Sequence, residues 1–111
     1  MNSQPARLAD LQQRLGHTFR DPELLLEALT HPSFLQEHPE VKAHNQRLEF
    51  LGDSVLHFVL SDALFREFAQ EREGVLSRRR AGLTRGEFLT RLALDLGVDA
   101  GLRLGQSEED A

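Results

Sequence analysis

The sequence predicts an all-α fold. Apolar residues recur every three or four positions in several windows, which is the helical period. No run alternates apolar and polar residues in the manner of a half-buried strand, and no glycine pattern of a P-loop or dinucleotide-binding unit occurs. With 40% hydrophobic and 28% charged residues over 111 positions, the composition is that of one folded domain. We therefore expect residues 1–111 to form a single helical domain.

Two short helices are expected first. One ends at Gly16, a favourable C-terminal stop, and has leucines at helical spacing, namely Leu8, Leu11 and Leu15. The second, "DPELLLEALT" over 21–30, begins with Asp21 as N-cap and Pro22 at the first helical position. Residues 33–44 contain Pro39 and show no periodicity, so they predict a loop with at most one helical turn.

A long helix is expected from Asn45, its N-cap, to about Phe68. Its apolar stripe should face the core and consists of Leu48, Leu51, Val55, Val59 and Ala63, widened by Leu56 and Phe58. The string "EREG" should end this helix, and a short helix should follow over 74–83.

The last helix should be "RGEFLTRLALDLG", over 85–97. Thr84 and Glu87 have the spacing of a capping box, and Gly97 supplies a stop. Its apolar face consists of Leu89, Leu92, Ala93 and Leu96. Residues 102–111 have no pattern that predicts an element.

Composition excludes several function classes. Without cysteine, neither a disulfide nor a thiolate metal site can form. No run approaches the roughly 20 apolar residues that cross a bilayer, so we expect a soluble, cytoplasmic protein that does not enter membranes. The net charge of −5 argues against a generally basic nucleic-acid-binding surface. Twelve of the 13 basic residues are arginine, which either serves phosphate contacts or reflects the base composition of the gene.

Two acids on the long helix require an explanation. Glu49 and Asp53 are one turn apart and lie on the same face, which Gln46 extends toward the N-terminus. Such a like-charge pair costs about 0.2 to 0.5 kcal/mol, and Gly52 costs roughly 0.8 to 1 kcal/mol more. The acids either form an ordinary exposed face, neutralised by Arg47 or by a base elsewhere, or bind a hard divalent cation.

The string "HNQRLEFLGDSVL", residues 44–56, resembles the signature helix of the ribonuclease III family. Residues 11–34 resemble the family's N-terminal entry, and residues 73–105 resemble the segment after the signature helix. The resemblance implies an all-α endonuclease domain that forms a homodimer and binds double-stranded RNA. It also implies hydrolysis of phosphodiesters with Mg²⁺, for which Mn²⁺ can substitute, leaving 5′-phosphate and 3′-hydroxyl ends.

The resemblance assigns roles to individual residues. Glu49 and Asp53 match the catalytic carboxylates that bind the metal, and Glu73 matches an auxiliary acid of the motif E-G-x-[LM]-S. Phe50 matches the aromatic side chain that enters a pocket of the partner subunit. Gln46 stands where many relatives have glutamate, and we expect it to adjust activity rather than abolish it.

A larger departure lies at the C-terminus. The family's second acidic motif, D-x-x-E, and its double-stranded-RNA-binding domain do not occur in this chain, so we expect an incomplete endonuclease domain that is inactive alone. Glu108, Glu109 and Asp110 lie in an unpatterned tail and are expected to be solvated rather than to replace the missing ligands.

The arginine-rich segment "LSRRRAGLTR" is the candidate RNA contact, through Arg78, Arg79, Arg80 and Arg85. These side chains could instead form a solvated face that pairs with nearby acids. His31, in "THPS", is expected to be a structural hydrogen-bonding residue.

Three functions remain open. The first is the endoribonuclease, acting in rRNA, mRNA and small-RNA processing. The second is a catalytically inactive module that dimerises and binds RNA or ribosomal partners, and the third is a helical dimerisation domain whose acids bind no metal.

Overall fold

The computed structural model describes residues 3–106 and confirms the all-α fold. Within this range six α-helices are followed by one 3₁₀ helix. They are α1 (Gln4–Leu15), α2 (Pro22–Leu29), α3 (Phe34–Glu37), α4 (Gln46–Glu67), α5 (Glu73–Thr84), α6 (Gly86–Leu96) and η1 (Val98–Gly101). The β-type pairing among these residues is an isolated parallel bridge between Thr30 and Arg103. No helix in this range is both long enough and apolar enough to cross a bilayer.

The second helix begins and ends where the sequence predicts, and the first ends at the predicted stop. The Asp21 side chain accepts a hydrogen bond from the Glu23 amide at 3.1 Å, so it caps α2. Gly16 ends α1 at φ 70°, a left-handed conformation that favours glycine. The apolar faces of both helices form the buried core, which consists of Leu8, Leu11, Leu25 and Leu29 with Phe19, Leu26 and Val98 packed around them. This core defines an N-terminal body to which η1 also belongs.

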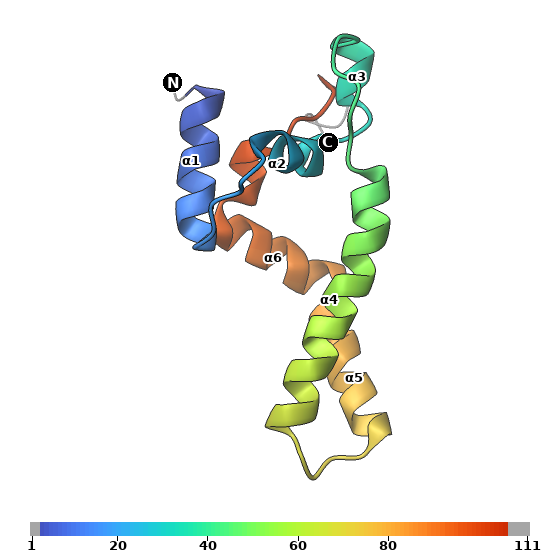
Figure 1. Ribbon diagram of the computed structural model, residues 1–111. Helices are drawn as coiled ribbons and strands as arrows, with labels where there is room; N and C mark the ends of the chain where they lie inside the picture. The colour runs from blue at the N-terminus through green and yellow to red at the C-terminus, as the bar shows by residue number, and fades with distance from the viewer. Residues whose placement is uncertain (1–2, 107–111) are drawn as a thin grey trace.

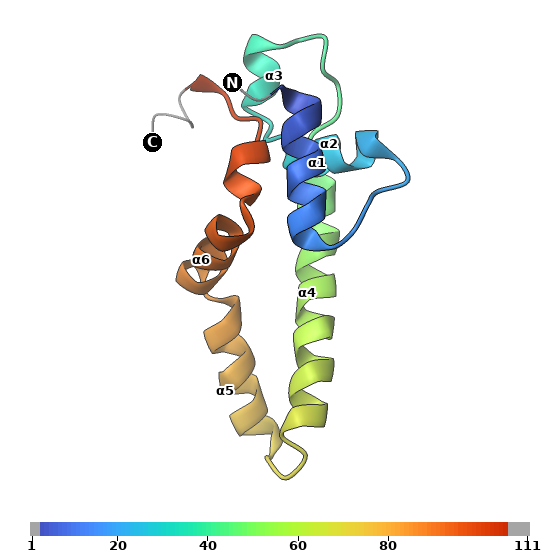
Figure 2. The same cartoon turned by 90° about the vertical axis from the view of Figure 1, so that its left-hand side faces the viewer.

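Helices α4 and α5 extend away from this body as an antiparallel pair (Figures 1 and 2). The 22 residues of α4 span about 33 Å at 1.5 Å per residue. The molecule is therefore elongated, with extents of 52 × 27 × 22 Å and a radius of gyration of 16.5 Å. A compact domain of this length would have a radius of gyration of about 13 Å.

The predicted core stripe of α4 is wrong for this chain. Leu51, Val55 and Val59 are 58%, 52% and 54% exposed. Ala63 and Phe58 are exposed too, and Leu48 and Leu56 are only partly buried. The residue of α4 that is buried is Leu64, which lies on the side toward α5. The physical reason is that α5 is the one helix that packs extensively against α4 within the described residues, so it covers one side of a helix that is apolar on more than one.

Two helix starts differ from the predicted capping. Asn45 precedes α4 as expected, but its side chain forms no cap and instead donates to the Ala28 carbonyl at 3.2 Å. Thr84 does not form a capping box with Glu87. It is the last residue of α5, and its hydroxyl donates back to the carbonyls of Arg80 and Ala81, because that hydroxyl is already within a helix. The stop at Gly97 is confirmed, with φ 78°.

The chain returns to the N-terminal body through α6 and η1. Residues 102–105 then lie beside residues 29–33, so the segment expected to be without structure forms the lone bridge. The acidic residues Glu108, Glu109 and Asp110 lie outside the described residues.

Candidate active site

The two carboxylates of the signature helix lie in its first two turns. Glu49 and Asp53 are both exposed and, with Gln46, Phe50 and Ser54, line an open depression of about 520 Å³. The helical spacing that the sequence shows therefore does bring the predicted pair and Gln46 to one surface. Neither acid is neutralised by an arginine or lysine within the described residues.

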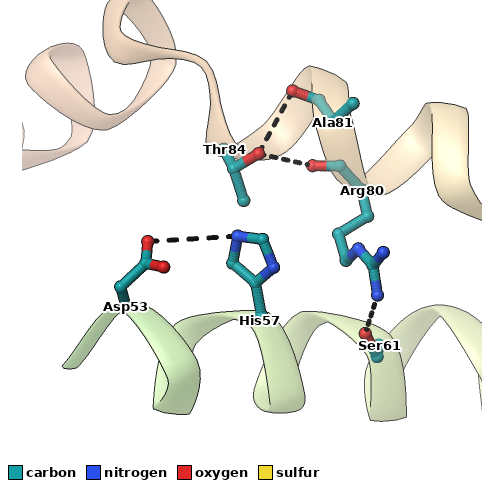
Figure 3. Close-up of polar contacts among 6 residues, drawn as sticks. All are labelled: Asp53, His57, Ser61, Arg80, Ala81 and Thr84. Carbon is teal, nitrogen blue, oxygen red and sulfur yellow. Dashed lines mark hydrogen bonds and ion pairs between the residues drawn. The ribbon is translucent and has the colours of Figure 1, made fainter. Parts of the chain in front are cut away.

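A histidine on the same helix lies beside Asp53. His57 Nε2 lies 4.0 Å from Asp53 Oδ1, one turn further along α4, and forms an ion pair when the imidazole is protonated. Figure 3 shows Asp53, His57 and Ser61 in one row that points toward the end of α5. Asp53 is therefore on the side of α4 that faces the α5–α6 junction.

The surface around Gly52 is open. A Cβ atom at this position would meet nothing within 4 Å among the described residues, so no contact within the chain requires glycine. Phe50 is 80% exposed, an unusual state for a large apolar side chain. The helix thus presents two acids, a bare stretch of backbone and an exposed phenyl ring together.

Glu73 is not brought to the two carboxylates. It is the first residue of α5, and its carboxylate accepts a hydrogen bond from Ser77 Oγ at 3.1 Å. It lines a second hollow, of about 470 Å³, with Ser61 and Phe65 among its other walls. Ser61 is two turns of α4 beyond Asp53, so about 12 Å along the helix separates the two sites.

The arginines of α5 have unlike surroundings. Arg79 donates two hydrogen bonds of 2.6 Å to Glu71, and its guanidinium stacks on Phe68 at 3.8 Å from the ring centre. Arg80 donates to Ser61 Oγ at 2.8 Å (Figure 3). Arg79 is thus paired with a nearby acid, the alternative that the sequence left open for this face.

Arg78, Arg79 and Arg85 of the predicted RNA-contact set are exposed, and of these Arg78 and Arg85 are the two outside the pair with Glu71. Within residues 3–106 neither side chain has an ion pair or hydrogen bond. Both guanidinium groups are therefore available for a ligand.

The Glu71–Arg79 pair was missed by sequence reasoning. Its partners are eight residues apart, with Glu71 in the α4–α5 connection and Arg79 in α5, so no helical spacing indicates the contact. The bonds to Arg79 hold the pKa of the Glu71 carboxyl below its ordinary value. The pair thus binds the α4–α5 connection to α5.

The metal-ligand set within the described residues is incomplete. Residues 3–106 hold no group of three or more histidine, aspartate and glutamate side chains that could bind a metal ion. Glu49 and Asp53 place two carboxylates at one depression, and Gln46 adds an amide oxygen there. These oxygen donors suit a hard divalent cation that keeps several waters.

A family model described as ribonuclease-III-like matches residues 21–111, most of the chain. The chain belongs to the ribonuclease III family. Among curated proteins it is 49% identical to Ribonuclease 3 of Carboxydothermus hydrogenoformans over 102 residues, which cover 91% of this chain and 43% of that protein. It is 52% identical to Ribonuclease 3 of Pseudomonas fluorescens over 101 residues, covering 91% and 42%.

Solved structures of the ribonuclease III family have the same fold. The nuclease domain of ribonuclease III from Campylobacter jejuni aligns with a TM-score of 0.82 and 38% identity, covering 93% of this chain and 68% of that one. That structure is described as flexible in a region involved in dimer formation. A second structure of the same nuclease domain gives a TM-score of 0.80 at 38% identity and covers 92% and 66%.

The chain spans less than half the length of the ribonuclease III relatives that it matches, at 43% and 42%. The family resemblance drawn from the signature helix is confirmed. The roles of Glu49, Asp53 and the other site residues stay predictions.

Proposed function

We propose that this chain is part of an endoribonuclease specific for double-stranded RNA. The enzyme would hydrolyse phosphodiesters with Mg²⁺, leave 5′-phosphate and 3′-hydroxyl ends, and process rRNA, mRNA and small RNAs in the cytoplasm. The observation that carries the proposal is the exposed, unneutralised pair of Glu49 and Asp53 on the signature helix of a ribonuclease III family member.

Glu49 and Asp53 would hold Mg²⁺, or Mn²⁺ in its place, and Gln46 would support it through an amide oxygen or a bridging water. The residues present fit such a cation in kind, because all three donors are oxygens that line one open depression. When bound, the cation would stabilise charge on phosphoryl oxygens and lower the pKa of a bound water. Two carboxylates supply only part of a coordination shell, so further ligands would come from water, RNA or protein beyond this chain.

The RNA backbone would meet the arginines of α5 and the α5–α6 junction. Arg78 and Arg85 are exposed and have no acidic partner within residues 3–106, so phosphate contact would cost them no existing bond. To bind phosphate, Arg79 would first have to break its hydrogen bonds to Glu71, and Arg80 its hydrogen bond to Ser61. We therefore expect Arg78 and Arg85 to contribute more to RNA affinity than Arg79 and Arg80.

The enzyme would act as a homodimer. Phe50, 80% exposed beside the acids, would enter a pocket of the second copy and bury its ring there. Burying an exposed aromatic ring is worth about 1.5 to 3 kcal/mol, enough to affect a dimer equilibrium.

The test is cleavage of a labelled long double-stranded RNA in Mg²⁺. We expect no cleavage by this chain and cleavage by the same protein extended through its natural downstream sequence. In the extended protein, Glu49→Gln and Asp53→Asn should abolish cleavage and leave RNA binding largely intact.

The matched control is Glu67→Gln, an exposed acid near the end of the same helix. It should cleave like the wild type. Undiminished cleavage by Glu49→Gln or Asp53→Asn would remove that residue from the metal site.

The second candidate is a non-catalytic module that dimerises and binds RNA or ribosomal partners. It predicts RNA binding without cleavage by both the chain and its extended form. A domain whose acids bind no metal predicts a melting temperature that millimolar Mg²⁺ or Mn²⁺ does not change, whereas a metal site of that affinity would raise it.

A further inference from the structure

Three segments that are distant in sequence meet at Thr30. This residue ends α2 and has no exposed surface. Its main-chain carbonyl accepts a hydrogen bond of 2.9 Å from the amide of Asn45, the residue before α4. Its hydroxyl accepts a bond of 2.9 Å from Arg103 Nε and donates to the Leu26 carbonyl within α2. The start of α4 and the returning C-terminal segment are thus bound to the same buried residue.

Arg103 is held here by its backbone and by its side chain. Its amide donates to the Leu29 carbonyl at 2.8 Å, and its carbonyl accepts from the His31 amide at 2.9 Å, which forms the parallel bridge. Its guanidinium also stacks over the ring of Phe34, 4.7 Å from the ring centre. The side chain therefore fills the junction between α2 and α3 as well as bonding Thr30.

The junction continues into the candidate active site. The Asn45 carbonyl accepts a 2.7 Å bond from the Glu49 amide, and the Asn45 side chain donates to the Ala28 carbonyl at 3.2 Å. One series of hydrogen bonds therefore runs from Arg103 through Thr30 and Asn45 to the backbone of Glu49.

Apart from this junction, α4 is tied to the N-terminal body indirectly, through α5 and then α6, which packs on α1 and η1. Helix α4 packs extensively on α5, whereas it has no comparable contact with α1 or α2 (Figure 1). The depression at Glu49 and Asp53 is lined by α4 alone. The orientation of the two carboxylates relative to the rest of the protein therefore depends on the anchor at the start of α4.

We propose that Thr30 and Arg103 are positioning residues: their side-chain bond holds Thr30 in place, and the main-chain carbonyl of Thr30, which accepts from the Asn45 amide, then fixes the start of α4 and so the direction of Glu49 and Asp53. This inference rests on the proposed function only in giving the two carboxylates a ligand to hold. Thr30 and Arg103 act through Asn45 and do not touch the reacting groups.

The natural absence of cysteine makes a direct distance measurement possible. Spin labels on Gln13→Cys in α1 and Ala63→Cys in α4, both exposed positions, report the spread of distances between the N-terminal body and α4. The chain is measured by double electron–electron resonance as wild type and with Thr30→Val, which removes the hydroxyl at nearly constant volume, or Arg103→Met.

Two controls separate positioning from a general loss of structure. Thr30→Ser keeps the hydroxyl and should restore the wild-type distance distribution. Thr84→Val removes a hydroxyl whose bonds to Arg80 and Ala81 stay within α5, so it should leave the distribution unchanged. We expect a broader distribution in Thr30→Val and Arg103→Met, while helical circular dichroism is retained.

The second readout is Mn²⁺ affinity of the same chain, measured by electron paramagnetic resonance. Because both carboxylates lie on α4 and their depression is lined by α4 alone, Thr30→Val and Arg103→Met should leave this affinity unchanged. A loss of Mn²⁺ affinity in either variant would overturn the proposal, because it would mean that the substitution disturbs α4 itself and not its anchor.

Wild-type distances in both variants would overturn the proposal as a whole. If Thr30→Val fails to fold, Arg103→Met decides, because Arg103 is only partly buried. A separate measurement tests the proposed function. Mn²⁺ binding that Asp53→Asn does not reduce would refute the metal site, while the distances still decide whether Thr30 and Arg103 orient α4.

Discussion

Gly105 is the position where one added methyl group should damage this fold most clearly. Its amide donates a buried hydrogen bond of 2.8 Å to Ser33 Oγ. A Cβ atom built on Gly105 would lie 2.6 Å from the Ser33 carbonyl oxygen and 2.9 Å from Ser33 Cβ. The carbonyl oxygen belongs to the backbone just before α3, so it cannot move aside by a change of rotamer. Gly105→Ala must therefore separate the two segments.

The magnitude follows from these contacts. Overpacking of a tight contact costs about 1 to 3 kcal/mol, and losing the amide hydrogen bond costs about 0.5 to 1.5 kcal/mol. Together the two effects reduce the free energy of unfolding by about 1.5 to 4.5 kcal/mol. At about 4 °C per kcal/mol for a domain of this size, the melting temperature should fall by at least about 6 °C.

The assay is thermal unfolding followed by circular dichroism at 222 nm, with Gly82→Ala as matched control. Gly82 lies inside α5, and a Cβ atom there would meet nothing within 4 Å. Because alanine favours the helix over glycine, Gly82→Ala should stabilise the protein by about 0.5 to 1 kcal/mol. An unchanged or raised melting temperature in Gly105→Ala would refute the close packing of residues 102–105 against α3.

Three further outcomes are expected. Gly52→Ala should raise the melting temperature, because the site is helical and open. Gly52→Ala should also weaken self-association if a second copy approaches the backbone at this position. A lowered melting temperature would contradict the open space around Gly52. Because Arg79 holds the pKa of Glu71 low, the pair stabilises the fold above the ordinary carboxyl pKa, and this stability is lost as the pH falls through the lowered value. Between about pH 6 and about pH 3 the melting temperature of the wild type should therefore fall more steeply with decreasing pH than that of Glu71→Gln. An equal dependence of the melting temperature on pH in both proteins would count against the pair. Phe50→Ala should shift the protein toward monomer in sedimentation velocity at low concentration, and an unchanged profile would exclude its ring from the interface.

Much of the secondary structure could be predicted because helix ends are local. Asp21 caps α2 through an amide two residues away, and Gly16 and Gly97 end their helices through their own backbone conformation. The capping box at Thr84 failed because the same hydroxyl can bond backward within α5, and sequence spacing does not show which bond forms.

The candidate site could be predicted in part for the same reason. Glu49 and Asp53 share a surface because helical spacing alone puts them there. Glu73 could not be placed by spacing, since its distance from Asp53 depends on how α5 folds back along α4. The pairing of Arg79 with Glu71 likewise depends on the turn between those helices.

The sequence by itself determined the helices, the signature motif and the placement of its two acids on one helix face, since each depends on residues within a few turns of one another. Only the tertiary structure decided what covers each helix. An apolar stripe requires a partner but does not identify it, so Val55 and Val59 appear in the sequence as core and are exposed in this chain. The same holds for the junction at Thr30, because its hydrogen bonds to Asn45 and Arg103 join segments that meet only once the whole chain has folded.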